Sequence, residues 1–151
     1  MKLDGAKPRA EKTMNLMGVD ITIKPVGLRV WLLINSKILD PKPITLTNSK
    51  TGVTQEDRSP EYLAQCEEMD MARLMVMFYF CVRHNPTLQF ETPKREIDSI
   101  DSTWALALLK EISDFLQIQD LAEIKNVIMS ATGIEDSEVT RAREGFLAQQ
   151  G

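Results

Sequence analysis

The sequence predicts a mainly α-helical domain, in which three principal helices form a bundle with a small N-terminal β element or hairpin. Apolar residues between Ile97 and Leu116 recur at steps of three and four, the period of an amphipathic helix. An uninterrupted apolar run, 74–82, follows a helix-start signal at Ser59-Pro60. Near the N-terminus, Val19–Ile23 alternates apolar and polar side chains, as a half-buried strand does.

Composition and charge fit one globular domain and disfavour two classes of partner. The chain has 151 residues, of which 43% are hydrophobic, enough for a core of its own. With a net charge of -4, the chain lacks the broad basic surface that nucleic-acid binding requires. The longest apolar run has nine residues, against the ~20 needed to cross a membrane. The N-terminus resembles no signal peptide, so we expect a cytoplasmic protein.

Three parts are predicted along the chain. Residues 1–13 are polar and show no helical or strand period, which is typical of a flexible N-terminal arm. Residues 14–134 form the single α-rich domain. Residues 135–151 are a charged C-terminal helix or tail with little apolar surface to bury.

The elements of the N-terminal third are short. Lys24-Pro25 ends the strand at 19–23, and 26–34 is predicted as a short helix, although its β-branched residues leave a strand as the alternative. Residues 44–54 are predicted as a hairpin, with Gly52 supplying a positive φ in the turn. Few of its side chains can face a core, so a disordered loop is the alternative.

The central helix is predicted to begin at Ser59, which suits an N-cap, and to extend to about His84, where Asn85-Pro86 stops it. The run 74–82 is apolar around the whole helix, so other helices or a partner must cover it on every side. Cys66 and Cys81 would lie ~22 Å apart on this helix, so both should be reduced thiols.

Two further helices complete the prediction. Thr92-Pro93 repeats the start signal ahead of the stripe at 97–116. The third segment, 120–131, ends at Gly133, a natural residue to follow a helix. The expected core comprises Leu74, Phe78, Phe80, Trp104, Leu108, Ile112, Phe115, Ile124 and Ile128.

Flexible apolar side chains are the best candidates for partner binding. Four of the eight methionines lie between 69 and 77, and such side chains adapt to varied apolar partners. Met69 and Met71 stand among charged residues, so we expect them to be exposed. With Trp31, they are the predicted partner-binding residues.

No catalytic, cofactor or metal motif is found. His84 is the single histidine, and its place near a helix end suits a capping cation or plain exposure. Cys66, Cys81 and His84 lack the spacing of a zinc site, and no phosphate-binding loop occurs. Seven acids against one lysine between 96 and 123 indicate either a solvated face or an acidic docking surface for a basic partner.

The order of these parts resembles that of the tail assembly chaperones of long-tailed bacteriophages. The resemblance is one of layout over 14–134, from Val19-Asp-Ile-Thr-Ile-Lys-Pro25 to Ile124-Lys-Asn-Val-Ile-Met-Ser-Ala-Thr-Gly-Ile134, and the hairpin at 44–54 departs from it. It implies a non-enzymatic protein, active in the host cytoplasm, that binds the helical tape measure protein and assists tail tube assembly.

Two alternatives remain from the residues themselves. A phage structural protein that self-associates, as a ring or connector component, would bury the same apolar surplus against its own copies. An enzyme that uses paired carboxylates would need a pocket in which their titration is shifted.

Overall fold

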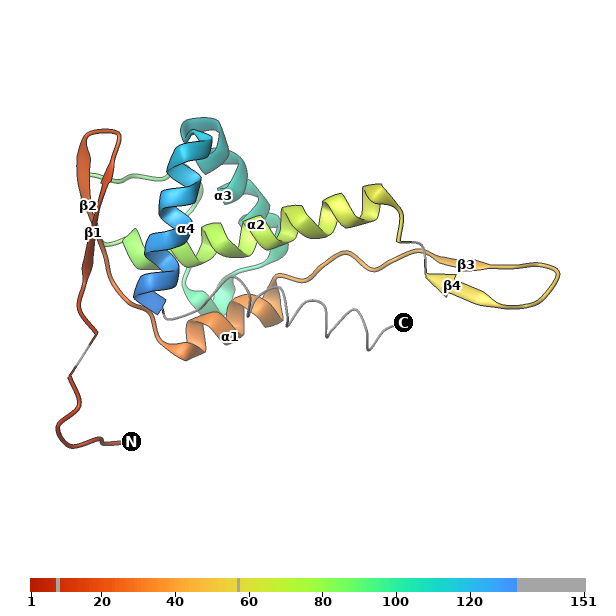
Figure 1. Cartoon of the computed structure of the whole chain (residues 1–151), viewed down its shortest axis with the longest axis horizontal. Coiled ribbons are helices and arrows are strands. Elements are labelled where there is room, and N and C mark those ends of the chain that lie inside the picture. Colours follow the sequence, from red (N-terminus) through yellow and green to blue (C-terminus); the bar gives the residue numbers. More distant parts are fainter. Residues whose placement is uncertain (8, 57, 133–151) are drawn as a thin grey trace.

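The computed structural model describes residues 1–7, 9–56 and 58–132. Within these ranges four α-helices form a body from which one β-hairpin projects, while a second hairpin lies at the other end (Figure 1). The mainly helical class is confirmed, but a bundle of three helices is wrong. The fourth is α1 (Leu28–Lys37), which the sequence predicts only as a short segment and which is a ten-residue helix packed on α2 (Pro60–Val82).

The N-terminal hairpin consists of β1 (Lys12–Leu16) and β2 (Val19–Ile23), paired antiparallel from Lys12↔Ile23 to Leu16↔Val19. The strand at 19–23 is therefore confirmed, and its partner was missed. Lys12 and Thr13, placed by prediction in the flexible arm, belong to β1. Met14, Leu16, Ile21 and Ile23 are buried against the helices because period-two alternation places them on one face.

The helix predicted over 26–34 is confirmed as α1, without the alternative strand. Arg73 of α2 fixes the chain where α1 ends. Its guanidinium donates to Ile38 O at 2.8 Å and to the Asp40 carboxylate at 2.7 Å, and it also bonds Asp70. Residues 38–40 are therefore held beside α2 before the chain turns outward.

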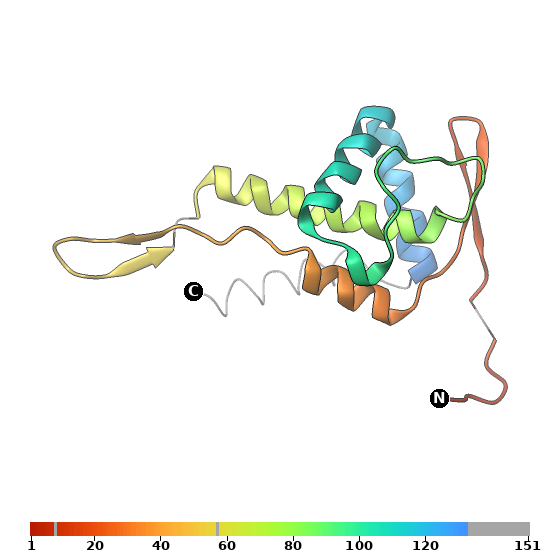
Figure 2. The same cartoon turned by 180° about the vertical axis from the view of Figure 1, so that it is seen from behind.

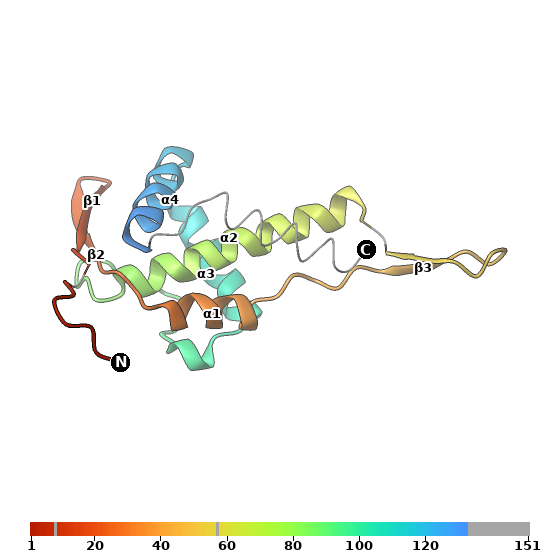
Figure 3. The same ribbon diagram turned by 60° about the horizontal axis from the view of Figure 1, so that its bottom comes forward.

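The hairpin predicted at 44–54 is present, one to two residues later. Strands β3 (Thr45–Thr47) and β4 (Thr54–Glu56) pair antiparallel, and Gly52 has a φ of +68° in the turn as expected. Figures 2 and 3 show that residues 41–56, which we call the arm, extend away from the helical body beyond the start of α2.

Helix α2 is the core helix that the apolar run predicts. The Ser59 side chain accepts a hydrogen bond from Tyr62 N, so the N-cap is confirmed. Every residue of 75–82 is buried and Leu74 is half-buried, covered by the other helices and the N-terminal hairpin. Cys66 and Cys81 are free thiols, as expected, and both are buried.

The start of the next helix differs from the prediction. Helix α3 (Ser102–Phe115) begins after Asp101, whose carboxylate accepts from Trp104 N, and not after Thr92-Pro93. The intervening chain contains one 3₁₀ turn, η1 (Ile97–Ser99). It is anchored by Glu111, which accepts from Glu91 N and Thr92 N at 2.7 Å each, so polar contacts there replace a helix.

Helix α4 (Ile118–Thr132) confirms the segment predicted at 120–131. Gly133, the rest of the domain to 134 and the C-terminal part 135–151 lie outside the described residues. Most of the predicted core is buried, but Phe115 is 63% exposed because it ends α3 on the outer side. No helix among the described residues is long and apolar enough to cross a membrane.

Candidate interaction surfaces

The three predicted partner-binding residues have different surroundings. Met69 is only 6% exposed, so the expectation that it is exposed is wrong, and Met71 and Trp31 are half-buried. Met69 lies on the face of α2 that carries Tyr62 and Cys66, the buried side of its first turns. Charged sequence neighbours are a poor guide here, because on a helix they occupy other faces.

The outer face of α1 carries exposed apolar side chains that the sequence did not single out. Leu28 and Leu32, one turn apart, are 70% and 57% exposed, and Trp31 lies beside them as the half-buried edge of this face. The opposite side of α1 buries Ile34 against the core. Because α1 is apolar on both sides, its hydrophobic pattern predicts a helix without telling which face meets the core.

The arm has one apolar face. Leu46 pairs with Gln55, and Asn48 N donates to Val53 O, so side chains at 44, 46 and 53 point to the same side of the hairpin. All three are exposed, with Leu46 at 56%. Between Pro41 and Gln55 the sequence contains two lysines, Lys42 and Lys50, and no acid. The arm, which ends at Glu56, therefore has two cations against one anion and an uncovered apolar side.

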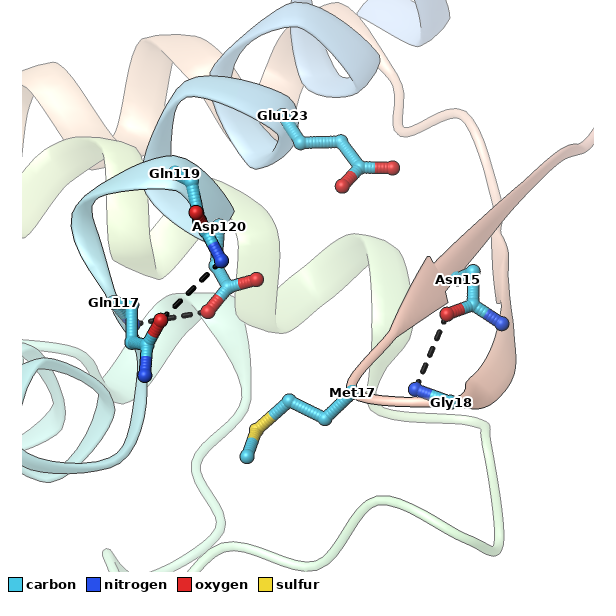
Figure 4. Close-up of a pocket in the computed structure, with 7 residues that line it drawn as sticks. All are labelled: Asn15, Met17, Gly18, Gln117, Gln119, Asp120 and Glu123. Carbon is cyan, nitrogen blue, oxygen red and sulfur yellow. Dashed lines mark hydrogen bonds between the residues drawn. The ribbon is translucent and has the colours of Figure 1, made fainter.

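A second exposed region lies where α3 passes into α4. We call it the α3–α4 corner and define it by Met17, Phe115 and Ile118 together with Asp114, Asp120 and Glu123. Ile118 is 88% exposed, and Met17 and Phe115 are also exposed. Figure 4 shows Met17 projecting from the β1–β2 turn at a pocket that Gln117, Asp120 and Glu123 also line. The region combines apolar side chains with acids.

Five of the seven acids between 96 and 123 have partners within the protein. Glu96, Asp98 and Asp101 form ion pairs with Arg83, Arg29 and Arg95, at 3.1, 2.6 and 2.9 Å. Glu111 anchors the chain at 91–92, and Asp120 accepts from Gln117 N at the start of α4. The alternative of an acidic docking surface for a basic partner stays a prediction. The exposed acids Asp114 and Glu123 belong to the corner.

Burial raises the pKa values of two titratable side chains, Cys81 and Tyr62. Burial raises the pKa of the Cys81 thiol to about 12, so it stays protonated and weakly nucleophilic at neutral pH. Burial, followed by contact with Cys66, raises the pKa of Tyr62 to about 12. His84 is exposed just beyond α2, as expected. Among the described residues, no three His, Cys, Asp or Glu side chains are grouped to hold a metal ion.

The described surface thus offers three apolar regions, on α1, on the arm and at the α3–α4 corner. Each has the exposed aliphatic or aromatic side chains from which protein interfaces are built. No family model, curated protein or solved structure compared with the chain matches it.

Proposed function

We propose that this protein is a non-enzymatic tail assembly chaperone of a long-tailed bacteriophage. In this role it binds the helical tape measure protein in the host cytoplasm and assists assembly of tail tube subunits. The layout of residues 14–134 supports the family. The observation that carries a client-binding role is the exposed apolar face of α1, formed by Leu28 and Leu32 with Trp31 beside them.

The spacing on α1 suits an amphipathic helix as client. Leu28, Trp31 and Leu32 follow the i, i+3, i+4 pattern with which one helix meets another. Trp31 is half-buried, which limits the rotamers that binding would have to freeze, and tryptophan is a frequent anchor at interfaces. A long helical protein with repeated apolar stripes would offer many such segments, and these stripes would need to be covered before assembly.

The test is capture of the client from infected or induced cells by the tagged protein, with retained proteins identified by mass spectrometry. We expect one long helical protein, captured by the wild type and lost with Leu32→Glu, which puts a charge into the apolar contact. Leu46→Glu is the matched control, because Leu46 has nearly the same exposure, 56% against 57%. Equal capture by both variants would mean that α1 is not the binding site. If the wild type captures no long helical protein, the proposed function is wrong.

A second candidate is a self-associating structural protein, a ring or connector component. The observation that favours it is the arm, which carries its apolar side chains away from the body. An isolated two-stranded hairpin is marginally stable in water, so such an arm gains most from a surface that covers it. In this role the protein would form its own assembly without a client.

A further inference from the structure

The arm needs a partner surface that matches it in two respects. Its single apolar face, Ile44, Leu46 and Val53, requires apolar side chains opposite. Its two lysines, Lys42 and Lys50, outnumber its one acid, Glu56, and favour an acidic surface on the partner. Both strands also have an unpaired edge, so the arm can be covered without displacing anything within its own hairpin.

The α3–α4 corner has this complementary character. From Lys110 to Lys125 the sequence contains four acids against two lysines, and Asp114 and Glu123 are exposed, as are Phe115 and Ile118. Met17 of the β1–β2 turn adds an exposed apolar side chain, beside a pocket that Asp120 and Glu123 also line (Figure 4). The outer face of α1 is less suited to the arm, because Arg29 lies beside Leu28 and the helix ends with Lys37.

The two regions lie far apart on one molecule. The arm extends from one end of the long axis, while the β1–β2 turn and the start of α4 lie toward the other end (Figures 1 and 2). Because the arm points away from the body and from its own corner, a contact between an arm and a corner joins different copies.

We infer that the arm of one copy docks on the α3–α4 corner of a second copy, in a head-to-tail contact. Leu46 and Val53 lie against Phe115, Ile118 and Met17, while Lys50 faces the corner acids. Such a contact is heterologous and leaves one arm and one corner unused, so copies add until a ring closes or an open series grows. The inference deepens the second candidate function, on which it rests, and does not depend on a client.

Two variants isolate the two halves of this contact. Leu46→Glu places a carboxylate in the arm's apolar face, and Ile118→Glu places one in the corner. Both side chains are exposed, so we expect folding stability to change by no more than about 0.5 kcal/mol. Leu32→Glu on α1 is the control, and circular dichroism with thermal unfolding verifies that all three variants fold.

The measurement is molecular mass in solution by sedimentation over a wide concentration range. We expect the molecular mass of the wild type and of Leu32→Glu to rise with concentration. Leu46→Glu alone and Ile118→Glu alone should each stay monomeric. An equimolar mixture of Leu46→Glu and Ile118→Glu retains one intact arm–corner pair, so it should form a dimer and nothing larger. Added salt should weaken the wild-type association, since part of it is charge attraction.

Three results would overturn the inference: a wild type that is monomeric at every concentration, a single variant that still associates, or a mixture that stays monomeric. None of them bears on client capture, which Leu32→Glu tests separately. If Leu32→Glu loses client capture but still self-associates, the α1 site is supported and the arm–corner contact is untouched, so failures of the two proposals are distinguishable.

Discussion

The side-chain amide of Asn85 pairs with both backbone groups of Thr22, accepting from its N–H at 3.0 Å and donating to its carbonyl at 2.8 Å. Asn85 also donates to Val82 O and is itself buried, so one residue joins the N-terminal hairpin to the end of α2. The asparagine that sequence analysis assigns to helix termination therefore also continues the hydrogen bonding of β2.

Asn85→Ala should destabilise the protein by about 2–3 kcal/mol, because it leaves the backbone groups of Thr22 without partners in a partly buried place. Urea unfolding at neutral pH measures the loss. Asn35→Ala is the control, since the Asn35 amide bonds Trp31 O in an exposed setting and its loss should cost far less. Equal effects of the two changes would mean that the Asn85 contact contributes little.

Trp104 should be the most sensitive aromatic residue. It is 3% exposed, its ring lies 5.2 Å from that of Tyr79 in an edge-on contact, and its indole donates to Pro93 O at 2.7 Å. Trp104→Ala should cost about 3–5 kcal/mol. Trp104→Phe, which restores the ring but not the donor, should recover part of this loss, and a cost for Trp104→Ala under about 1 kcal/mol would contradict the packing described.

Glu111 should make stability depend on acid pH. Burial alone raises its pKa, but hydrogen bonds from the Thr92 side chain, Thr92 N and Glu91 N outweigh it and lower the pKa below its ordinary value of 4.5. A carboxylate with a lowered folded pKa stabilises fully above its unfolded pKa, and the contribution is lost as pH falls through the folded value.

The comparison is between the wild type and Glu111→Gln, by urea unfolding at a series of pH values. The wild type should be more stable at pH 7, and the difference should shrink as pH falls below about 4.5. A difference that is constant down to strongly acidic pH would show that the ionised carboxylate is not what anchors the chain at 91–92.

Met17 occupies a backbone conformation that costs an ordinary residue free energy. Its φ is +52° and that of Gly18 is +85°, so both turn residues are left-handed, as the tightest hairpin turns require. Met17→Asn should leave the fold unchanged or stabilise it, by no more than about 1 kcal/mol, since asparagine adopts this conformation more readily. If Met17 contributes to the corner, the same variant should associate more weakly in sedimentation, and unchanged association would exclude it from the contact.

Local signals in the sequence predicted much of this fold. Ser59-Pro60 identified the start of α2, Gly52 identified the turn of the arm, and the apolar run at 74–82 identified the core helix. Thr92-Pro93 misled because the chain that follows is held by Glu111, a contact twenty residues away in sequence. Such long-range polar contacts produce no periodic pattern in the sequence, so they could not be predicted from it.

The interaction surfaces were harder to predict. Met69 stands between two acids in the sequence and Leu32 between two apolar residues, yet the first is buried and the second exposed, because the packing of α1 and α2 decides which face is covered. The corner was missed for a similar reason. Phe115 belongs to a stripe typical of a core helix and Ile118 lies between two predicted helices, yet both are exposed where α3 passes into α4.

The central claim is that client binding and self-association use separate surfaces. The most direct measurement titrates a purified helical segment of the captured client into Leu46→Glu and into Leu32→Glu, with tryptophan fluorescence as the signal. The account predicts one segment bound per chain of Leu46→Glu and binding weaker by about tenfold or more for Leu32→Glu. Equal affinity of the two variants would contradict it.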